Sequence, residues 1–261
     1  MSVIDNIENE ELIVENDEIV GVRYVKDGYD RVIYSNRVIL VAGPIGSTLF
    51  LRSVGINTGK EFKYSGAVDV GGILKDINQQ SEVQMNAIAA GEKFILAPRF
   101  SKSLKEDLNC KDEDLFSISV RSLDSGKGYI DDEGNEIDEG IDSIAGLKEG
   151  IETAKKVLIR AGVSEDTIKG SETKAINPTG CASIGDIVNS NLETEIRSLY
   201  VCDISVLPET SGKPLTLTYL ALAKRLADYL SGAGYESRYC ISEYGVGKDY
   251  GIMSGWKRDA V

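Results

Sequence analysis

Two positions at the ends of apolar runs are the first candidates for chemistry in this sequence. Asp203 follows the short apolar run 199–202, and Gly43 ends the continuous apolar run 37–43. In α/β proteins, ligands bind where the carboxyl ends of buried strands meet at one edge of a sheet. A run that is apolar throughout also favours a strand covered on both faces, as in a parallel sheet. Asp203, together with the Pro/Gly turn and the helix that follow it, therefore predicts a ligand site at the carboxyl edge of a sheet.

The turn after the first run admits two interpretations. Residues 43–47 read Gly-Pro-Ile-Gly-Ser and precede a helical apolar spacing over 48–54. A strand, a glycine turn and a helix can cradle a phosphate with backbone N–H groups. The pattern is neither G-x-G-x-x-G nor the P-loop pattern, which requires a lysine beside its last glycine. A tight strand-to-helix turn with no ligand is therefore the plainer interpretation.

The absence of histidine excludes several classes of enzyme. The 261 residues include no histidine. The chain itself therefore has no Ser-His-Asp triad, Cys-His dyad, histidine metal site or histidine general base. The four cysteines are widely spaced and form no C-x-x-C pair. Neither a zinc knuckle nor a dithiol redox motif is therefore supported, and no metal site is predicted.

Charge and hydropathy restrict the partners. The formal net charge is −13, which disfavours binding to nucleic acid and to anionic membrane surfaces. No apolar run approaches the roughly 18 residues that span a bilayer, and the start does not read as a signal peptide. A cytoplasmic protein is therefore expected.

The remaining elements position these candidates. Short β-rich runs at 11–14, 18–25 and 31–34 predict a small antiparallel meander. Further β-like runs at 66–74, 83–90, 93–97 and 115–120, with a helix at 103–109, predict an antiparallel sheet with helices on one face. Apolar spacing predicts helices at 144–161 and 217–230, and the acidic stretch 126–142 is expected to be a solvated loop. The fold class is α/β, of mixed α+β character.

Four stretches of the sequence form a set in one order. They are V-I-L-V-A-G-P-I-G-S-T-L-F-L-R-S-V-G-I, L-K-E-G-I-E-T-A-K-K-V-L-I-R-A-G, N-P-T-G-C-A-S-I-G, and L-Y-V-C-D-I-S-V-L-P followed by G-K-P-L-T-L-T. Together they resemble the glucose-methanol-choline (GMC) family of FAD-dependent oxidoreductases. The fourth is the most specific. The resemblance implies an oxidoreductase that passes hydride from the CH–OH group of a small alcohol to FAD.

The resemblance also implies a division of the chain. It predicts an incomplete FAD-binding three-layer domain into which an antiparallel-sheet substrate domain is inserted. Residues 1–56 and 175–232 would be the FAD-domain pieces, 57–174 the substrate domain, and 233–261 a tail.

Cofactor-binding roles are carried over from the matching motifs. Ala42 and Gly43 would lie near the adenosine half of FAD, and Asp203 with the backbone of Ile204 near the pyrophosphate and ribityl region. Pro214 and Leu215 would bring main-chain groups and a helix N-terminus to the flavin pyrimidine, where the helix dipole stabilises negative charge.

The sequence departs from the family where the catalyst is expected. Asn177 replaces the family's histidine before one proline, and Lys213 replaces the His or Asn before another. An asparagine does not accept a proton at ordinary pH, and a lysine acts as a base only when burial lowers its pKa by several units. The family's glycine fingerprint for FAD phosphates is also missing from the chain, and family members are about twice as long. The FAD phosphate-binding unit would then come from a protein partner or from a missing N-terminal segment.

Two functions therefore remain open. One is an FAD-dependent oxidase or dehydrogenase in which Asn177 and Lys213 occupy the catalytic positions. The alternative is a catalytically inactive, truncated or divergent GMC-like protein that acts as a binding or structural subunit.

Overall fold

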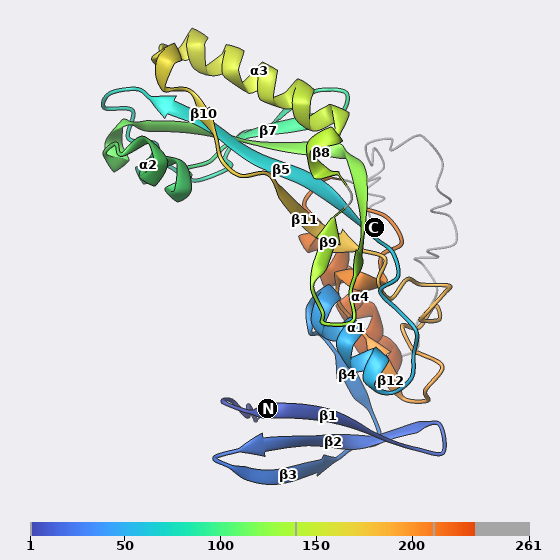
Figure 1. The fold of residues 1–261 in the computed structure, drawn as a ribbon. Helices are drawn as coiled ribbons and strands as arrows, with labels where there is room; N and C mark the ends of the chain where they lie inside the picture. The colour runs from blue at the N-terminus through green and yellow to red at the C-terminus, as the bar shows by residue number, and fades with distance from the viewer. Residues whose placement is uncertain (1, 139, 211, 233–261) are drawn as a thin grey trace, which may run out of the picture.

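The protein combines three β-sheets with helices in a mixed α/β fold, as predicted (Figure 1). The structure is a computed structural model and describes residues 2–138, 140–210 and 212–232. The predicted tail 233–261 lies outside the described residues. The strands are β1 (Glu8–Glu15), β2 (Glu18–Lys26), β3 (Tyr29–Tyr34), β4 (Val38–Leu40), β5 (Phe62–Ile73), β6 (Ala89–Ala90), β7 (Phe94–Pro98), β8 (Leu115–Ile130), β9 (Glu136–Asp138), β10 (Lys169–Gly170), β11 (Lys174–Thr179) and β12 (Leu199–Val201). The helices are α1 (Gly43–Ser53), α2 (Lys102–Leu108), α3 (Ala145–Ala161) and α4 (Thr216–Leu230).

The N-terminal strands form the predicted meander. Strands β1, β2 and β3 pair antiparallel in that order. Asp17 and Asp27 have positive φ, which suits the tight turns between these strands. This sheet lies at one end of the molecule, away from α3 (Figure 1).

The large sheet is antiparallel and is covered on one face by α3. Its strand order is β10-β5-β8-β7-β6, with β11 also on β5 and β9 on β8. Leu147, Ala154 and Leu158 of α3 are buried against Val68 and Val120 of the sheet. Apolar side chains at helical spacing on α3 thus meet apolar side chains at alternate positions on the strands.

Three details of the sequence prediction were wrong. Residues 126–142 are not simply a loop, because β8 continues to Ile130 and pairs with β9. Gly126 and Gly128 lie directly against the rings of Tyr64 and Phe62, and this packing holds the glycines in a strand. The strand expected over 83–90 is reduced to β6. Ala161 is exposed, although the apolar spacing over 144–161 predicts it on the buried side of this helix.

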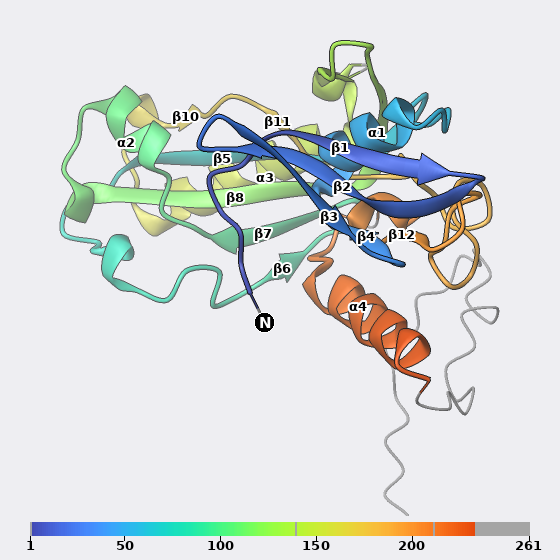
Figure 2. The ribbon, with the colours of Figure 1, turned by 90° about the horizontal axis from the view of Figure 1, so that it is seen from below.

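A short pair of parallel strands joins a segment near the N-terminus to one near the end of the described residues. Leu199, Tyr200 and Val201 of β12 pair in parallel with Val38, Ile39 and Leu40 of β4. Figure 2 shows α1 and α4 on opposite sides of this pair. Both helices contribute side chains to the same hydrophobic cluster, Leu51 from α1 and Leu226 from α4. The three layers predicted for this region are therefore α1, the β4–β12 pair and α4.

Buried apolar side chains form two hydrophobic clusters. One surrounds the β4–β12 pair and the other lies between α3 and the large sheet. The expected boundary between residues 174 and 175 falls inside β11, which pairs with β5 of the large sheet. The functional division of the chain remains a prediction. Within the described ranges, no helix has the length and apolar character needed to cross a bilayer.

Candidate functional site

Asp203 lies at the carboxyl end of β12 and binds the turn that follows β4. Its Oδ2 accepts hydrogen bonds from the Gly43 N–H at 3.0 Å and from the Ser47 hydroxyl at 2.6 Å. Its Oδ1 accepts from the Ser205 N–H at 2.9 Å, at the start of the short 3₁₀ turn Ile204–Val206. Asp203 and Gly43 therefore meet at the carboxyl edge of the parallel β4–β12 pair.

The glycine turn owes its geometry to this carboxylate. Gly43 has a φ of +74°, a value that non-glycine residues rarely adopt, and its N–H points to Asp203. The N-terminus of α1 thus holds a carboxylate of the chain itself, which the helix dipole stabilises. This geometry supports the tight-turn interpretation of residues 43–47, because the N–H that would bind a phosphate is already bonded. Ala42, the adjoining predicted residue, is exposed.

Sequence reasoning missed Ser47. Its side chain is completely buried and donates the shortest of the three bonds to Asp203. The available signal was its position one helical turn after Gly43, which places it on the same face of α1 as the first N–H groups. Ser47 therefore belongs with Asp203 and Gly43 in one hydrogen-bonded unit.

Asn177 occupies a bulge at the edge of the large sheet. In β11, Ile176 pairs with Ser65 and Thr179 with Lys63, and a register shift separates these pairs. Asn177 lies within the shift with a φ of +53°, which asparagine tolerates better than most residues. Bulges redirect side chains and are frequent beside active sites. This geometry is compatible with the predicted role, which remains a prediction.

The segment that leads to α4 approaches the same stretch of β5. The hydroxyls of Thr210 and Ser65 are 3.2 Å apart, and Glu209 forms an ion pair with Lys63. A Cβ at Gly212 would lie 2.1 Å from the Ser122 carbonyl oxygen of β8, so this backbone lies directly on the sheet. The segments that carry Asn177 and Lys213 are therefore both anchored near residues 63–65.

The residues around the start of α4 differ in exposure. Lys213 and Pro214 are exposed, whereas Leu215, the residue before the helix, is 9% exposed. In the structure Lys213 lacks the burial that a role as a base requires. Ile204, the remaining predicted cofactor residue, is half-buried in the 3₁₀ turn beside Asp203.

A cavity of about 320 Å³ lies between residues 57–63, at the start of β5, and residues 180–187, which follow β11. None of the residues predicted from the sequence lines it. Cys181 is on its wall and is only 2% exposed. Burial, with a smaller contribution from the negative charges of Glu136 and Asp203, raises the pKa of the Cys181 thiol to about 11.

Cys181 is therefore expected to resist alkylation. Three pH units below its pKa, at pH 8, only about one Cys181 thiol in a thousand is the reactive thiolate. Iodoacetamide labelling at pH 8, followed by peptide mass spectrometry, should show Cys181 reacting at least about tenfold more slowly than the more exposed Cys110. The rate should rise as the pH increases toward 11. Equal labelling of the two cysteines would contradict the burial of this thiol.

Comparison with known proteins supports the fold and the motifs. Residues 133–223 match the family model described as GMC oxidoreductase. An uncharacterized protein of Methanocaldococcus jannaschii is 30% identical over 211 residues, which are 77% of this chain and 54% of that protein.

Two solved structures share the fold. Pyridoxine 4-oxidase from Mesorbium loti matches with a TM-score of 0.60 and 13% identity, over 86% of this chain and 57% of that chain. A formate oxidase structure matches with a TM-score of 0.60 and 15% identity, over 89% of this chain and 61% of that chain. The chain thus spans little more than half the length of the proteins it matches. The family match and the shared fold together confirm the predicted resemblance to the C-terminal portion of the GMC oxidoreductases.

Proposed function

We propose that this chain forms the flavin-facing part of an FAD-dependent oxidoreductase that oxidises the CH–OH group of a small alcohol. The observation that carries the proposal is the hydrogen-bonded unit in which Asp203 closes the carboxyl end of the β4–β12 pair. It combines the sheet edge at which α/β proteins bind ligands with the part of the sequence that matches GMC oxidoreductases.

Asp203 and the start of α4 are suited to the flavin half of FAD. Helix α4 has no acidic residue in its first turn, and no side chain among the described residues caps its N-terminus. Its first N–H groups and its dipole can therefore face an electron-rich group such as the flavin pyrimidine. Among the described residues, Asp203 Oδ1 receives one hydrogen bond, from the Ser205 N–H, and can accept a further one from a ligand hydroxyl. Pro214 and Leu215 would set the approach to the helix, and Ala42, Gly43 and Ile204 would line the remaining contacts.

The phosphates of FAD would need a further unit. The sequence has no G-x-G-x-x-G pattern after a strand, and the N-terminus of α1 already holds Asp203. In the described part of the chain, β4 pairs with β12 on one edge and with no strand on its other edge. Ile39 and Val41 beside that edge are 43% and 68% exposed. Parallel sheets are normally larger and covered, which supports a dinucleotide-binding unit from polypeptide outside these residues docking against β4.

FAD, when bound, would accept hydride from the alcohol carbon. The N–H groups at the start of α4 would stabilise negative charge that develops on the flavin. The hydroxyl proton requires an acceptor, and Asn177 is not one. Asn177 could instead orient the hydroxyl by hydrogen bonding. Lys213 is the candidate base within this chain only if the docking unit buries its ammonium group.

A second candidate is a binding or structural subunit without turnover. The observations that favour it are the amide at Asn177 and the exposure of Lys213. In that case the edge would bind a flavin, or hold a partner, without oxidising an alcohol.

Flavin content distinguishes these proposals. We expect the protein purified from its own cells, with whatever partner it retains, to show flavin absorbance in the visible range. Under the enzyme proposal, small primary alcohols should bleach this absorbance, and Lys213→Met should slow bleaching by at least about tenfold. Lys156→Met, at an exposed position on α3, is the matched control and should change nothing.

Two other results of the flavin measurement also distinguish the proposals. Flavin that no alcohol bleaches would favour the binding subunit. A colourless protein that also fails to bind added FAD would exclude the enzyme proposal and leave only the binding or structural subunit.

A further inference from the structure

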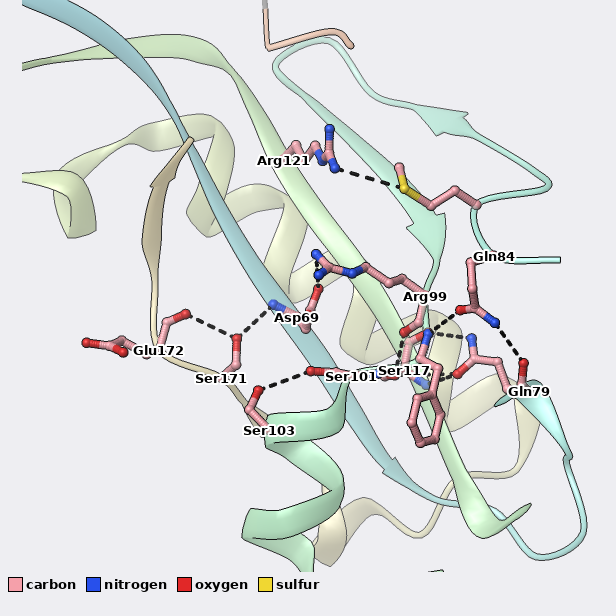
Figure 3. A network of polar contacts seen from close by, with 12 residues as sticks. Asp69, Gln79, Gln84, Arg99, Ser101, Ser103, Ser117, Arg121, Ser171 and Glu172 are labelled. Carbon is pink, nitrogen blue, oxygen red and sulfur yellow. Dashed lines mark hydrogen bonds and ion pairs between the residues drawn. The ribbon is translucent and has the colours of Figure 1, made fainter. Parts of the chain in front are cut away.

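The face of the large sheet opposite α3 carries two arginines, Arg99 and Arg121. Within the described residues, Arg99 forms an ion pair with Asp69, and Arg121 forms none. Successive residues of a strand point to opposite faces, and Ile118 and Val120 of β8 lie in the core under α3. Ser119 and Arg121 therefore point to the other face, together with Asp69, which pairs with Ser119 in β5. Arg99 follows β7 and points to the same group (Figure 3).

The contacts within this group leave guanidinium donors unused. Arg99 Nη1 lies 3.7 Å from Asp69 Oδ1, and the Arg99 side chain is 48% exposed. Arg121 Nη2 contacts the Met85 sulfur at 3.9 Å, and thioether sulfur is a weak acceptor (Figure 3). The Arg121 Nε is buried and has no hydrogen-bond partner among the described residues.

A second unpartnered group lies beside Arg121. Ser119 is 2% exposed, and in the part of the chain that the structure describes its hydroxyl has no hydrogen-bond partner. It points to the same face as Arg121, two positions along β8. A buried hydroxyl without a partner is unfavourable, so a partner from a ligand would stabilise it.

Electrostatics favours an anion at this place. Two guanidinium groups face one carboxylate, Asp69, and burial together with the charge of Arg99 lowers the pKa of Arg121. Arginine nevertheless remains charged at any physiological pH. Lys174 of β11 lies in the same cross-strand row, since both Lys174 and Arg121 pair with Ala67. This face thus carries three basic side chains, those of Arg99, Arg121 and Lys174, although the whole chain has a net charge of −13.

We propose that this face binds the carboxylate of a hydroxy-acid substrate. The two parallel N–H groups of a guanidinium match the two oxygens of a carboxylate, and the Ser119 hydroxyl can donate a further hydrogen bond. The assignment rests on the proposed function, since it names the class of alcohol that the enzyme would oxidise. It concerns binding alone and can be measured without flavin.

Binding to the full chain without added flavin tests the proposal. The probes are two matched pairs at constant ionic strength: lactate against 1,2-propanediol, and mandelate against 1-phenyl-1,2-ethanediol. Isothermal titration calorimetry should detect at least one of the two acids, and neither diol at the same concentration. Arg121→Gln should weaken acid binding at least about tenfold, because truncating one partner of a hydrogen-bonded charge pair leaves the other partner unpaired. Arg99→Gln should weaken it less, because Arg99 is half-exposed and shared with Asp69.

A surface arginine provides the control. Arg23 of β2 forms an exposed ion pair with Glu11 on the small sheet, so Arg23→Gln should leave acid binding unchanged. Thermal unfolding without ligand shows whether Arg121→Gln is folded, and Arg121→Lys keeps the charge without the planar fork. Acid binding that both Arg99→Gln and Arg121→Gln leave intact would overturn the proposal, as would diols that bind as well as the acids. Inorganic phosphate that binds as tightly as the acids would overturn the carboxylate assignment.

The result is separable from the flavin test. Acid binding in a protein that never binds flavin would sustain this site and reject the oxidoreductase proposal. Alcohol-dependent bleaching without any preference for acids would do the reverse.

Discussion

Asp203→Ala is expected to lower the free energy of unfolding by about 3 kcal/mol. The carboxylate accepts hydrogen bonds from the Gly43 N–H, the Ser47 hydroxyl and the Ser205 N–H. A hydrogen bond to a charged group contributes about 1.5–3 kcal/mol, but bonds to one carboxylate are not additive. Asp203 is half-buried, so water can replace part of what is lost. Urea denaturation followed by circular dichroism measures the change.

Neighbouring substitutions separate this network from a general effect of charge. Asp186 is exposed on the nearby loop, and Asp186→Ala should change the free energy of unfolding by less than about 0.5 kcal/mol. Asp203→Asn keeps one acceptor oxygen and should fall between the wild type and Asp203→Ala. Ser47→Ala removes a single bond, and in the Asp203→Ala background it should have a smaller effect than on its own. Equal stability of Asp203→Ala and Asp186→Ala would refute the structural role assigned to Asp203.

This unit also shows how far the sequence could predict the site. The position of Asp203 at a ligand edge was predictable because it ends an apolar run, and α/β proteins bind ligands at the carboxyl ends of such strands. Ser47 was not, because a serine inside an amphipathic helix reads as a surface residue. Its role depends on the pairing of β4 with β12, which brings it to Asp203 across 156 residues of chain.

The face of the large sheet that carries Arg99 and Arg121 has a sequence signal that was not used. Ser117, Ser119 and Arg121 alternate with apolar residues along β8, so one face of this strand is polar although the strand is largely buried. The alternation predicts a polar face. Whether its polar groups find hydrogen-bond or ion-pair partners depends on Asp69, Met85 and Arg99, which reach this face from other segments.

Helix α3 shows the same division between local pattern and packing. Its limits were predicted within one residue, because Leu147, Ala154 and Leu158 recur at helical spacing. Gly146 and Gly150 are buried as well, although glycine contributes no hydrophobic signal and is the least favourable helix residue after proline. Their burial depends on how closely the helix approaches the large sheet, which no local pattern reports.

Gly146→Ala is expected to destabilise the protein by about 2 kcal/mol or more, although the substitution favours a helix. Helix propensity alone predicts a gain of about 0.5–1 kcal/mol. A Cβ at this position would lie 2.1 Å from the Lys93 carbonyl oxygen. That oxygen also accepts a 2.7 Å hydrogen bond from the Leu123 N–H, so it cannot move without loss. Overpacking costs typically 1–3 kcal/mol and more against rigid backbone, so the steric term exceeds the propensity.

A graded series of glycine substitutions tests this explanation. At Gly150 a Cβ would meet the Val120 side chain at 2.4 Å, and a side chain can shift where a backbone oxygen cannot, so Gly150→Ala should destabilise less. Gly170 has its nearest neighbour at 3.8 Å, and Gly170→Ala should lie within about 0.5 kcal/mol of the wild type. Urea denaturation of the three variants gives the order directly. If Gly146→Ala were stabilising, helix propensity would outweigh packing and α3 would not rest on the Lys93 carbonyl as closely as the structure places it.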